Sequence, residues 1–88
     1  MEIFYTYKAA KQLRILPKVI QKRIANKLRF YAEQDNPIEF AERLTDRRDG
    51  QFRFRVGMYR LIFDVMDGKI YILAIGKRDS IYERLKSH

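Results

Sequence analysis

The chain has 88 residues and a mass of 10.7 kDa, which is the size of one small domain. It has no cysteine, and its one histidine is the last residue, His88. This composition excludes disulfides, a cysteine nucleophile and Cys-based zinc sites, and it makes a His-ligated metal or a Ser-His-Asp triad implausible. We expect no metal and no other cofactor. Nineteen basic residues against eleven acidic ones give a net charge of +8, which favours a polyanionic partner.

No apolar run reaches the ~18 residues that a membrane span needs, and the N-terminus lacks the layout of a signal peptide. We therefore expect a soluble, cytoplasmic protein with no membrane partner.

The first half of the chain has helical periodicity. A short β-prone segment, Ile3–Tyr5, is followed by Thr6, a candidate N-cap for a helix over Tyr7–Ile15. Pro17 marks the corner to a second helix over Lys18–Gln34, because proline is tolerated in the first helical turn. The second helix has a single apolar stripe, so the two are expected to form a helical hairpin that covers a sheet.

The second half alternates polar and apolar residues, which is typical of strands. Three strands are expected, at residues 51–56, 59–66 and 69–76, joined by two-residue turns at Gly57-Met58 and Asp67-Gly68. Residues 38–44 form either a short helix or an irregular crossing, and residues 79–86 are predicted to form a short C-terminal helix. The prediction is one α+β domain over residues 1–88, with an N-terminal helical hairpin on a small, mainly antiparallel four-stranded sheet.

The two turns fix the strand register, and the register assigns side chains to faces. The expected core face carries Phe52, Phe54, Val56, Tyr59, Leu61, Phe63, Val65, Ile70, Ile72 and Ala74. The opposite face carries Arg53, Arg55 and Arg60 beside Ile62, Leu73 and Ile75, and Lys77 continues it with Arg78 next in the chain.

On this second face Arg55 is expected to lie directly opposite Arg60. Like charges in that position are destabilising, and a bound anion would relieve the repulsion. Arginine suits phosphate because its planar fork binds two oxygens at once and stays charged. Tyr82, four residues past Arg78, is a candidate for stacking on a base. The alternative is an ordinary solvated face, on which Asp64 would pair with one arginine.

Two segments carry a family resemblance: the run from Phe52 to Phe63 (FRFRVGMYRLIF), and the run from Ala74 to Arg78 (AIGKR) with Tyr82 after it. In combination they resemble the RelE/ParE superfamily of prokaryotic toxin–antitoxin toxins, and Leu16-Pro17-Lys18 and Glu42-Arg43-Leu44 also fit. The resemblance implies a toxin that a cognate antitoxin neutralises, with DNA bound only indirectly, through the antitoxin complex.

The RelE branch further implies a metal-independent, cofactor-free endoribonuclease. Such a toxin cleaves mRNA in the ribosomal A site by attack of a 2′-hydroxyl on the adjacent phosphate. The residues that match its catalytic positions are Arg53, Arg55, Arg60, Arg78 and Tyr82, and the expected RNA-binding residues are Lys77, Arg47 and Arg48.

RelE has lysines where Arg53 and Arg55 stand, and an arginine effectively cannot give up its proton. The identity of the general base therefore stays open. Two other functions also stay open: a ParE-like inhibitor of DNA gyrase without chemistry, and a non-catalytic homologue that only binds an antitoxin.

Overall fold

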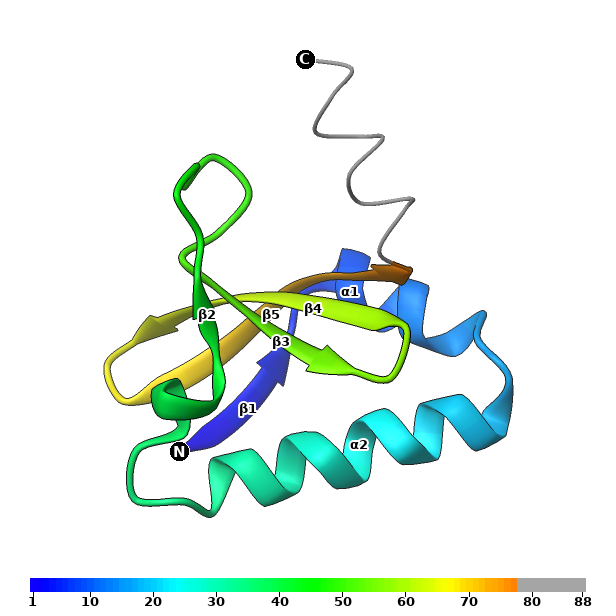
Figure 1. Ribbon diagram of the computed structural model, residues 1–88. Helices are drawn as coiled ribbons and strands as arrows, with labels where there is room; N and C mark the ends of the chain where they lie inside the picture. The colour runs from blue at the N-terminus through cyan, green and yellow to red at the C-terminus, as the bar shows by residue number, and fades with distance from the viewer. Residues whose placement is uncertain (78–88) are drawn as a thin grey trace.

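The computed structural model describes residues 1–77 of the chain (Figure 1). In chain order the elements are β1 (Glu2–Tyr5), α1 (Tyr7–Arg14), α2 (Lys18–Ala32), a 3₁₀ helix η1 (Pro37–Phe40), β2 (Glu42–Arg43), β3 (Phe52–Val56), β4 (Tyr59–Met66) and β5 (Lys69–Lys77). The predicted C-terminal helix, with Arg78 and Tyr82, lies outside the described residues. No helix in the described part is long and apolar enough to cross a membrane.

The described residues form an α+β fold with two α-helices and a five-stranded mixed sheet. The strand order is β1-β5-β4-β3-β2, and β1 runs parallel to β5 while the other pairs are antiparallel. The predicted four strands were one too few, because β2 is only two residues long and too short to show alternation in the sequence. The helix α2 runs along one side of the sheet, and the loop from β2 to β3 projects on the other (Figure 1).

The helical hairpin begins and turns where the sequence predicts. The hydroxyl of Thr6 accepts a hydrogen bond from the Ala9 N–H at 3.1 Å, which caps α1. Pro17 is the N-cap residue of α2. From α2, Ile24, Leu28 and Tyr31 are buried against the sheet.

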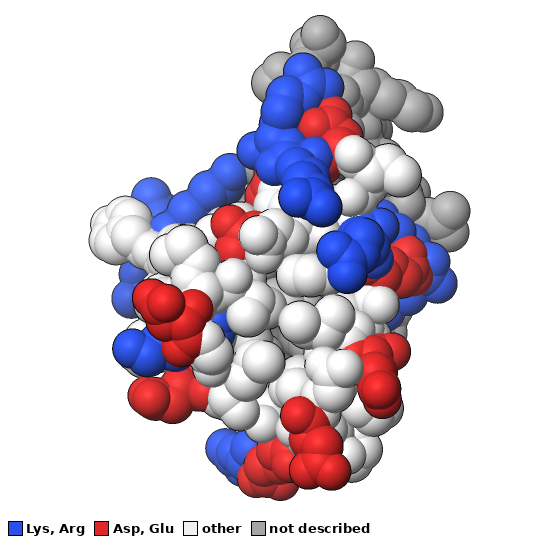
Figure 2. Space-filling view, turned by 90° about the vertical axis from the view of Figure 1, so that its left-hand side faces the viewer, with Lys and Arg blue, Asp and Glu red and all other residues white. Residues whose placement is uncertain are grey.

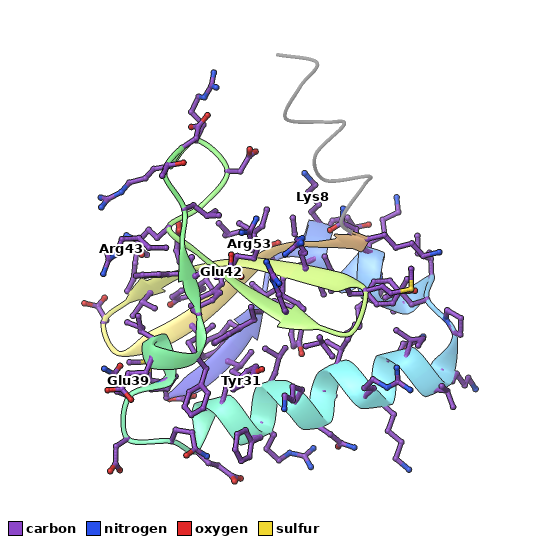
Figure 3. The ribbon with its side chains drawn as sticks, in the orientation of Figure 1. Lys8, Tyr31, Glu39, Glu42, Arg43 and Arg53 are labelled. Carbon is purple, nitrogen blue, oxygen red and sulfur yellow. The ribbon has the colours of Figure 1, made fainter. Side chains whose placement is uncertain are left out.

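Aromatic stacking joins this helix to the sheet. The Tyr31 ring lies between α2 and the strands (Figure 3) and stacks on Phe54 with ring centroids 4.5 Å apart. Phe54 stacks in turn on Phe63 at 4.2 Å. Offset stacking of this kind adds to the energy of burial, so these rings fix the helical layer against β3 and β4.

The tight turns have the backbone that their residues favour. Gly57 has a φ of 59°, and Asp67 and Gly68 have φ values of 53° and 71°. In the Asp67-Gly68 turn, the two successive positive φ values are those of a type I′ turn, which suits the twist of a hairpin. The β3–β4 register is the predicted one, with Arg55 opposite Arg60 and Arg53 opposite Ile62.

A β-bulge changes the register of β4 against β5. Ile62 lies opposite Ala74 and Phe63 lies opposite Ile72, so Leu73 is an extra residue in β5. Beyond it Ile75 joins the main core, whereas Ala74 packs with Ile62 on the other face. The predicted faces of Ala74 and Ile75 were therefore wrong, because turn residues alone do not reveal a bulge.

The start of the chain supports this bulge. Beyond its pairing with β1, β5 forms hydrogen bonds with Thr6 and with α1. The Thr6 hydroxyl donates to the Leu73 carbonyl at 3.2 Å, and the Gln12 side-chain oxygen accepts from the Ile75 N–H at 2.8 Å. These contacts satisfy backbone groups near the irregularity, so the bulge leaves them paired.

A small second core anchors the β2–β3 loop. Ile62 and Ala74 are buried there, with Leu44 and Leu73 packed against them. The Gln51 N–H donates to the Asp64 carboxylate at 2.8 Å, and the Gln51 side-chain oxygen accepts from the Val65 N–H at 3.0 Å. The loop is thus fixed at its base, on the face of the sheet that carries the arginines.

Candidate functional site

The structure brings Arg53, Arg55 and Arg60 together on one face of the sheet, as predicted. Arg53 and Arg55 alternate with core residues along β3, and Arg60 lies on β4 directly opposite Arg55. Residues that oppose one another across two strands share a face, so the three guanidinium groups start from neighbouring positions.

Within residues 1–77, Glu42 is a counterion of this cluster, and no sequence pattern indicates that role. Glu42 lies on β2 opposite Arg53, and Figure 3 shows the two side chains side by side above the sheet. One of its carboxylate oxygens contacts Arg53, and the other lies 2.8 Å from the Nε of Arg55. The expected carboxylate, Asp64, instead accepts the hydrogen bond from the Gln51 backbone.

Glu42 stands in the stretch that carries the family resemblance, but nothing in the sequence marks residues 42–43 as a strand. The pairing of Glu42 with Arg53 depends on that strand, so the sequence alone does not predict it. The alternating pattern that predicts longer strands needs four or more residues to be recognised.

The local charge strongly favours the ionised form of Glu42. The hydrogen bond from Arg53 lowers the pKa of this carboxyl, and the positive fields of Arg53, Arg55 and Arg60 lower it further. Three guanidinium groups against one carboxylate leave a net charge of +2 on these four side chains. Taken by themselves, these four side chains therefore favour an anionic ligand.

Exposure differs sharply among the three arginines. Arg60 is only 4% exposed and the Arg53 side chain 14%, whereas the Arg55 side chain is 59% exposed. A ligand arriving from solvent would meet Arg55 first. Arg60 would act from beneath, where lower local dielectric strengthens its field.

The two predicted RNA-binding arginines Arg47 and Arg48 are neighbours in the projecting loop between β2 and β3. Arg48 forms hydrogen bonds of 2.6–3.1 Å with the Asp46 carboxylate, and this partner raises the pKa of Arg48. Its side chain is nevertheless 76% exposed, and such surface pairs are weak. Figure 2 shows basic side chains gathered in the upper part of one face, at the level of this loop in Figure 1.

Lys77 is not on the arginine face. The bulge places it opposite Tyr59, a residue of the main core, so the predicted continuation of the arginine face through Lys77 was wrong. Arg78 and Tyr82 lie outside the described residues. Within residues 1–77 no group of three or more histidine, cysteine, aspartate or glutamate side chains is arranged to hold a metal ion.

The solved structures that are similar to the chain include three toxin–antitoxin complexes. The toxin–antitoxin complex RelBE2 from Mycobacterium tuberculosis has a TM-score of 0.71 and 25% identity, over 88% of this chain and 96% of that one. The RelB–RelE complex from Methanococcus jannaschii has a TM-score of 0.71 and 22% identity, over 92% and 96%. The intact RelBE complex from E. coli has a TM-score of 0.68 and 20% identity, over 86% and 94%.

No curated protein matches the chain. A family model does: the ParE toxin of the type II toxin–antitoxin system parDE, over residues 3–82. The match covers nearly the whole chain, and the solved structures agree with it in fold. The chain accordingly belongs to the ParE toxin family and is a RelE/ParE superfamily toxin of a type II toxin–antitoxin system.

Proposed function

We propose that this toxin is a metal-independent endoribonuclease that cleaves mRNA in the ribosomal A site and is neutralised by a cognate antitoxin. The observation that supports the proposal is the grouping of Arg53, Arg55 and Arg60 around the Glu42 carboxylate on one sheet face. This arrangement supplies both positive charge for a phosphate and an ionised group that can accept a proton.

The reaction is the attack of a ribose 2′-hydroxyl on the adjacent phosphate. A 2′-oxygen to phosphorus bond forms and the bond to the 5′-oxygen breaks, which leaves a 2′,3′-cyclic phosphate and a free 5′-hydroxyl. The transition state carries extra negative charge on the phosphate oxygens. Cations fixed at that position stabilise it, and losing one such donor typically costs about 10²–10³ in rate.

In this scheme Arg55 binds the phosphate first and Arg60 stabilises it from below. The family resemblance adds Arg78 at the phosphate, and Tyr82 at the 2′-hydroxyl or stacked on a base. The loop arginines Arg47 and Arg48 contact neighbouring backbone. Arginine effectively keeps its proton, so none of these arginines is the base.

Glu42 is the candidate general base of the described residues. A glutamate is ionised at neutral pH, and the hydrogen bond from Arg53 lowers the pKa of Glu42 further. A low pKa makes it a weak base while both arginines hold it. When Arg55 turns to the substrate phosphate, Glu42 loses one ion-pair partner and its pKa rises. It then takes the 2′-hydroxyl proton and can return it to the leaving 5′-oxygen.

Primer extension on mRNA in programmed ribosomes tests this reading. We expect Arg55→Ala to slow cleavage by about 10²–10³ and Glu42→Gln to slow it by about 10²–10⁴. The matched control is Arg29→Ala, which removes an equal charge from the exposed side of α2 and should leave the rate unchanged. Wild-type cleavage by both site variants would exclude this site.

The second candidate is inhibition of DNA gyrase without chemistry. Two observations favour it: the matching family model is that of ParE, and Glu42 neutralises part of the arginine cluster. The two functions separate cleanly, because purified protein either blocks gyrase supercoiling or cuts ribosome-bound mRNA. Supercoiling inhibition that survives Arg55→Ala, with no cleaved mRNA, would favour the gyrase function.

A further inference from the structure

All of the chain's excess positive charge is carried by the segment of the two helices. Residues 7–32 contain eight of the nineteen basic residues and none of the eleven acidic ones, so the rest of the chain is balanced at eleven against eleven. The eight are Lys8, Lys11, Arg14, Lys18, Lys22, Arg23, Lys27 and Arg29. The arginine cluster on the sheet therefore does not account for the net charge, and the helices need an explanation of their own.

A shallow groove, largely open to solvent, lies along the outer surface of α2, with a volume of about 590 Å³. Its lining residues are Val19, Lys22, Arg23, Asn26, Lys27 and Phe30. They recur at steps of three and four residues, which places them on one face of the helix. No acidic side chain lines the groove.

Charge and apolar surface alternate along this groove. Val19 at one end is 70% exposed and Phe30 at the other is 47% exposed, with the three cations between them. The Phe30 ring contacts Phe40, itself 46% exposed, with centroids 6.0 Å apart. The Phe30 end is thus a small apolar patch, of the kind that anchors partner side chains.

We propose that this groove docks an acidic amphipathic helix of a partner protein. Phe30 is eleven positions after Val19, which is about 16 Å along a helix and matches about three turns of a partner helix. Such a helix would place an apolar side chain at each end of the groove and two or three carboxylates against Lys22, Arg23 and Lys27. This is recognition of a helix in a groove, with charge complementarity setting specificity.

Other occupants fit less well. A second copy of the chain would bring the same cations against one another, and like charges across an interface cost several kcal/mol. A single-stranded nucleic acid would use the cations and could stack a base on Phe30, but the exposed Val19 at the other end would stay in water. An acidic amphipathic segment uses the cations together with the apolar residues at both ends of the groove.

The proposal does not depend on RNA cleavage. The groove residues lie on α2, and in Figure 3 the labelled Arg53 and Glu42 lie on the far side of the sheet from that helix. Variants of the groove should leave the chemistry of the arginine face unchanged, so the two proposals can fail separately.

The test is a calorimetric titration of the protein with designed helical peptides. One 15-residue peptide carries leucines at both ends of one face and glutamates between them, and a second carries lysines in place of the glutamates. The double variant Lys22→Glu/Lys27→Glu should bind the glutamate peptide at least about 10-fold more weakly than wild type and should gain affinity for the lysine peptide.

The matched control is Lys8→Glu/Lys11→Glu, which makes the same change of charge on exposed positions of α1, outside the groove. It should weaken binding less than about 3-fold, as expected for exposed charges outside the groove, which salt screens from the ligand. Phe30→Ala, checked for folding by circular dichroism, should weaken binding about 5-fold or more through loss of the apolar anchor.

Three results would overturn the proposal. The first is no saturable binding of the glutamate peptide by wild type. The second is an equal loss in the two charge-reversal variants, which would indicate attraction by net charge alone. The third is saturable binding of a 12-nucleotide oligouridine that is lost in Lys22→Glu/Lys27→Glu, with no difference between those proteins toward the peptide. That last result would assign the groove to nucleic acid.

Discussion

Gly50 lies where the loop beside the arginine face meets the small second core. A side chain at this position should lower the stability of the fold. A Cβ on Gly50 would lie 2.5 Å from Cγ2 of Ile62 and 3.2 Å from Cδ1 of Leu73. An ordinary carbon–carbon contact is about 3.5–4.0 Å, so Ile62 must retreat by about 1 Å. Ile62 is only 1% exposed and packs on Ala74, so it has little room to move.

Overpacking of this kind costs about 1–3 kcal/mol. For a chain of this size, a loss of 1 kcal/mol lowers Tm by about 4–8 °C. We therefore expect Gly50→Ala to lower Tm by roughly 5–20 °C. Thermal unfolding followed by circular dichroism measures this directly.

A double-mutant cycle identifies the contact. Ile62→Ala alone removes buried methyl groups and should cost about 2–5 kcal/mol. In the double variant, the methyl group that Gly50→Ala adds fills part of the space that Ile62→Ala opens. The cost of the pair should fall short of the sum by about 1 kcal/mol or more.

Gly68→Ala is the comparison for backbone strain alone. Gly68 has a φ of 71° and no atom within 4 Å of an added Cβ, so its substitution should cost about 1–2 kcal/mol and show no coupling to Ile62→Ala. Additive costs for Gly50→Ala and Ile62→Ala would refute the clash, and with it the account of how the loop is anchored.

Two further predictions concern stability. Thr6→Val removes the hydroxyl that caps α1 and donates to the Leu73 carbonyl. It should lower the free energy of unfolding, measured by urea titration, by about 1–2 kcal/mol. Thr6→Ser keeps the hydroxyl and should retain most of the wild-type stability. The Glu42 ion pairs should stabilise the fold above the ordinary glutamate pKa of 4.5, because Arg53 lowers the folded-state pKa, and the effect should vanish as pH falls through that lower value. Since the Glu42 side chain is 43% exposed, the effect is below about 1 kcal/mol. The gap in urea midpoint between wild type and Glu42→Gln should close as pH falls below 4.5 and through the lowered folded-state pKa. A gap that stays constant with pH would contradict this assignment.

The sequence by itself determined the elements whose signals are local. Thr6 and Pro17 mark the starts of the two helices because a cap and a proline act within one turn. Gly57-Met58 and Asp67-Gly68 fix the hairpins because few residues adopt positive φ. From the first of these turns the β3–β4 register follows, and with it the shared face of three arginines.

Only the tertiary structure decided what lies next to those arginines. Glu42 comes from a two-residue strand with no periodicity of its own, so its contacts with Arg53 and Arg55 arise from sheet pairing across a loop. The bulge at Leu73 is likewise stabilised from a distance, by Thr6 and Gln12, more than sixty residues away in sequence. It moves Lys77 off the arginine face. Local patterns specify where helices and turns begin, but pairings between distant segments depend on packing that no short stretch of sequence contains.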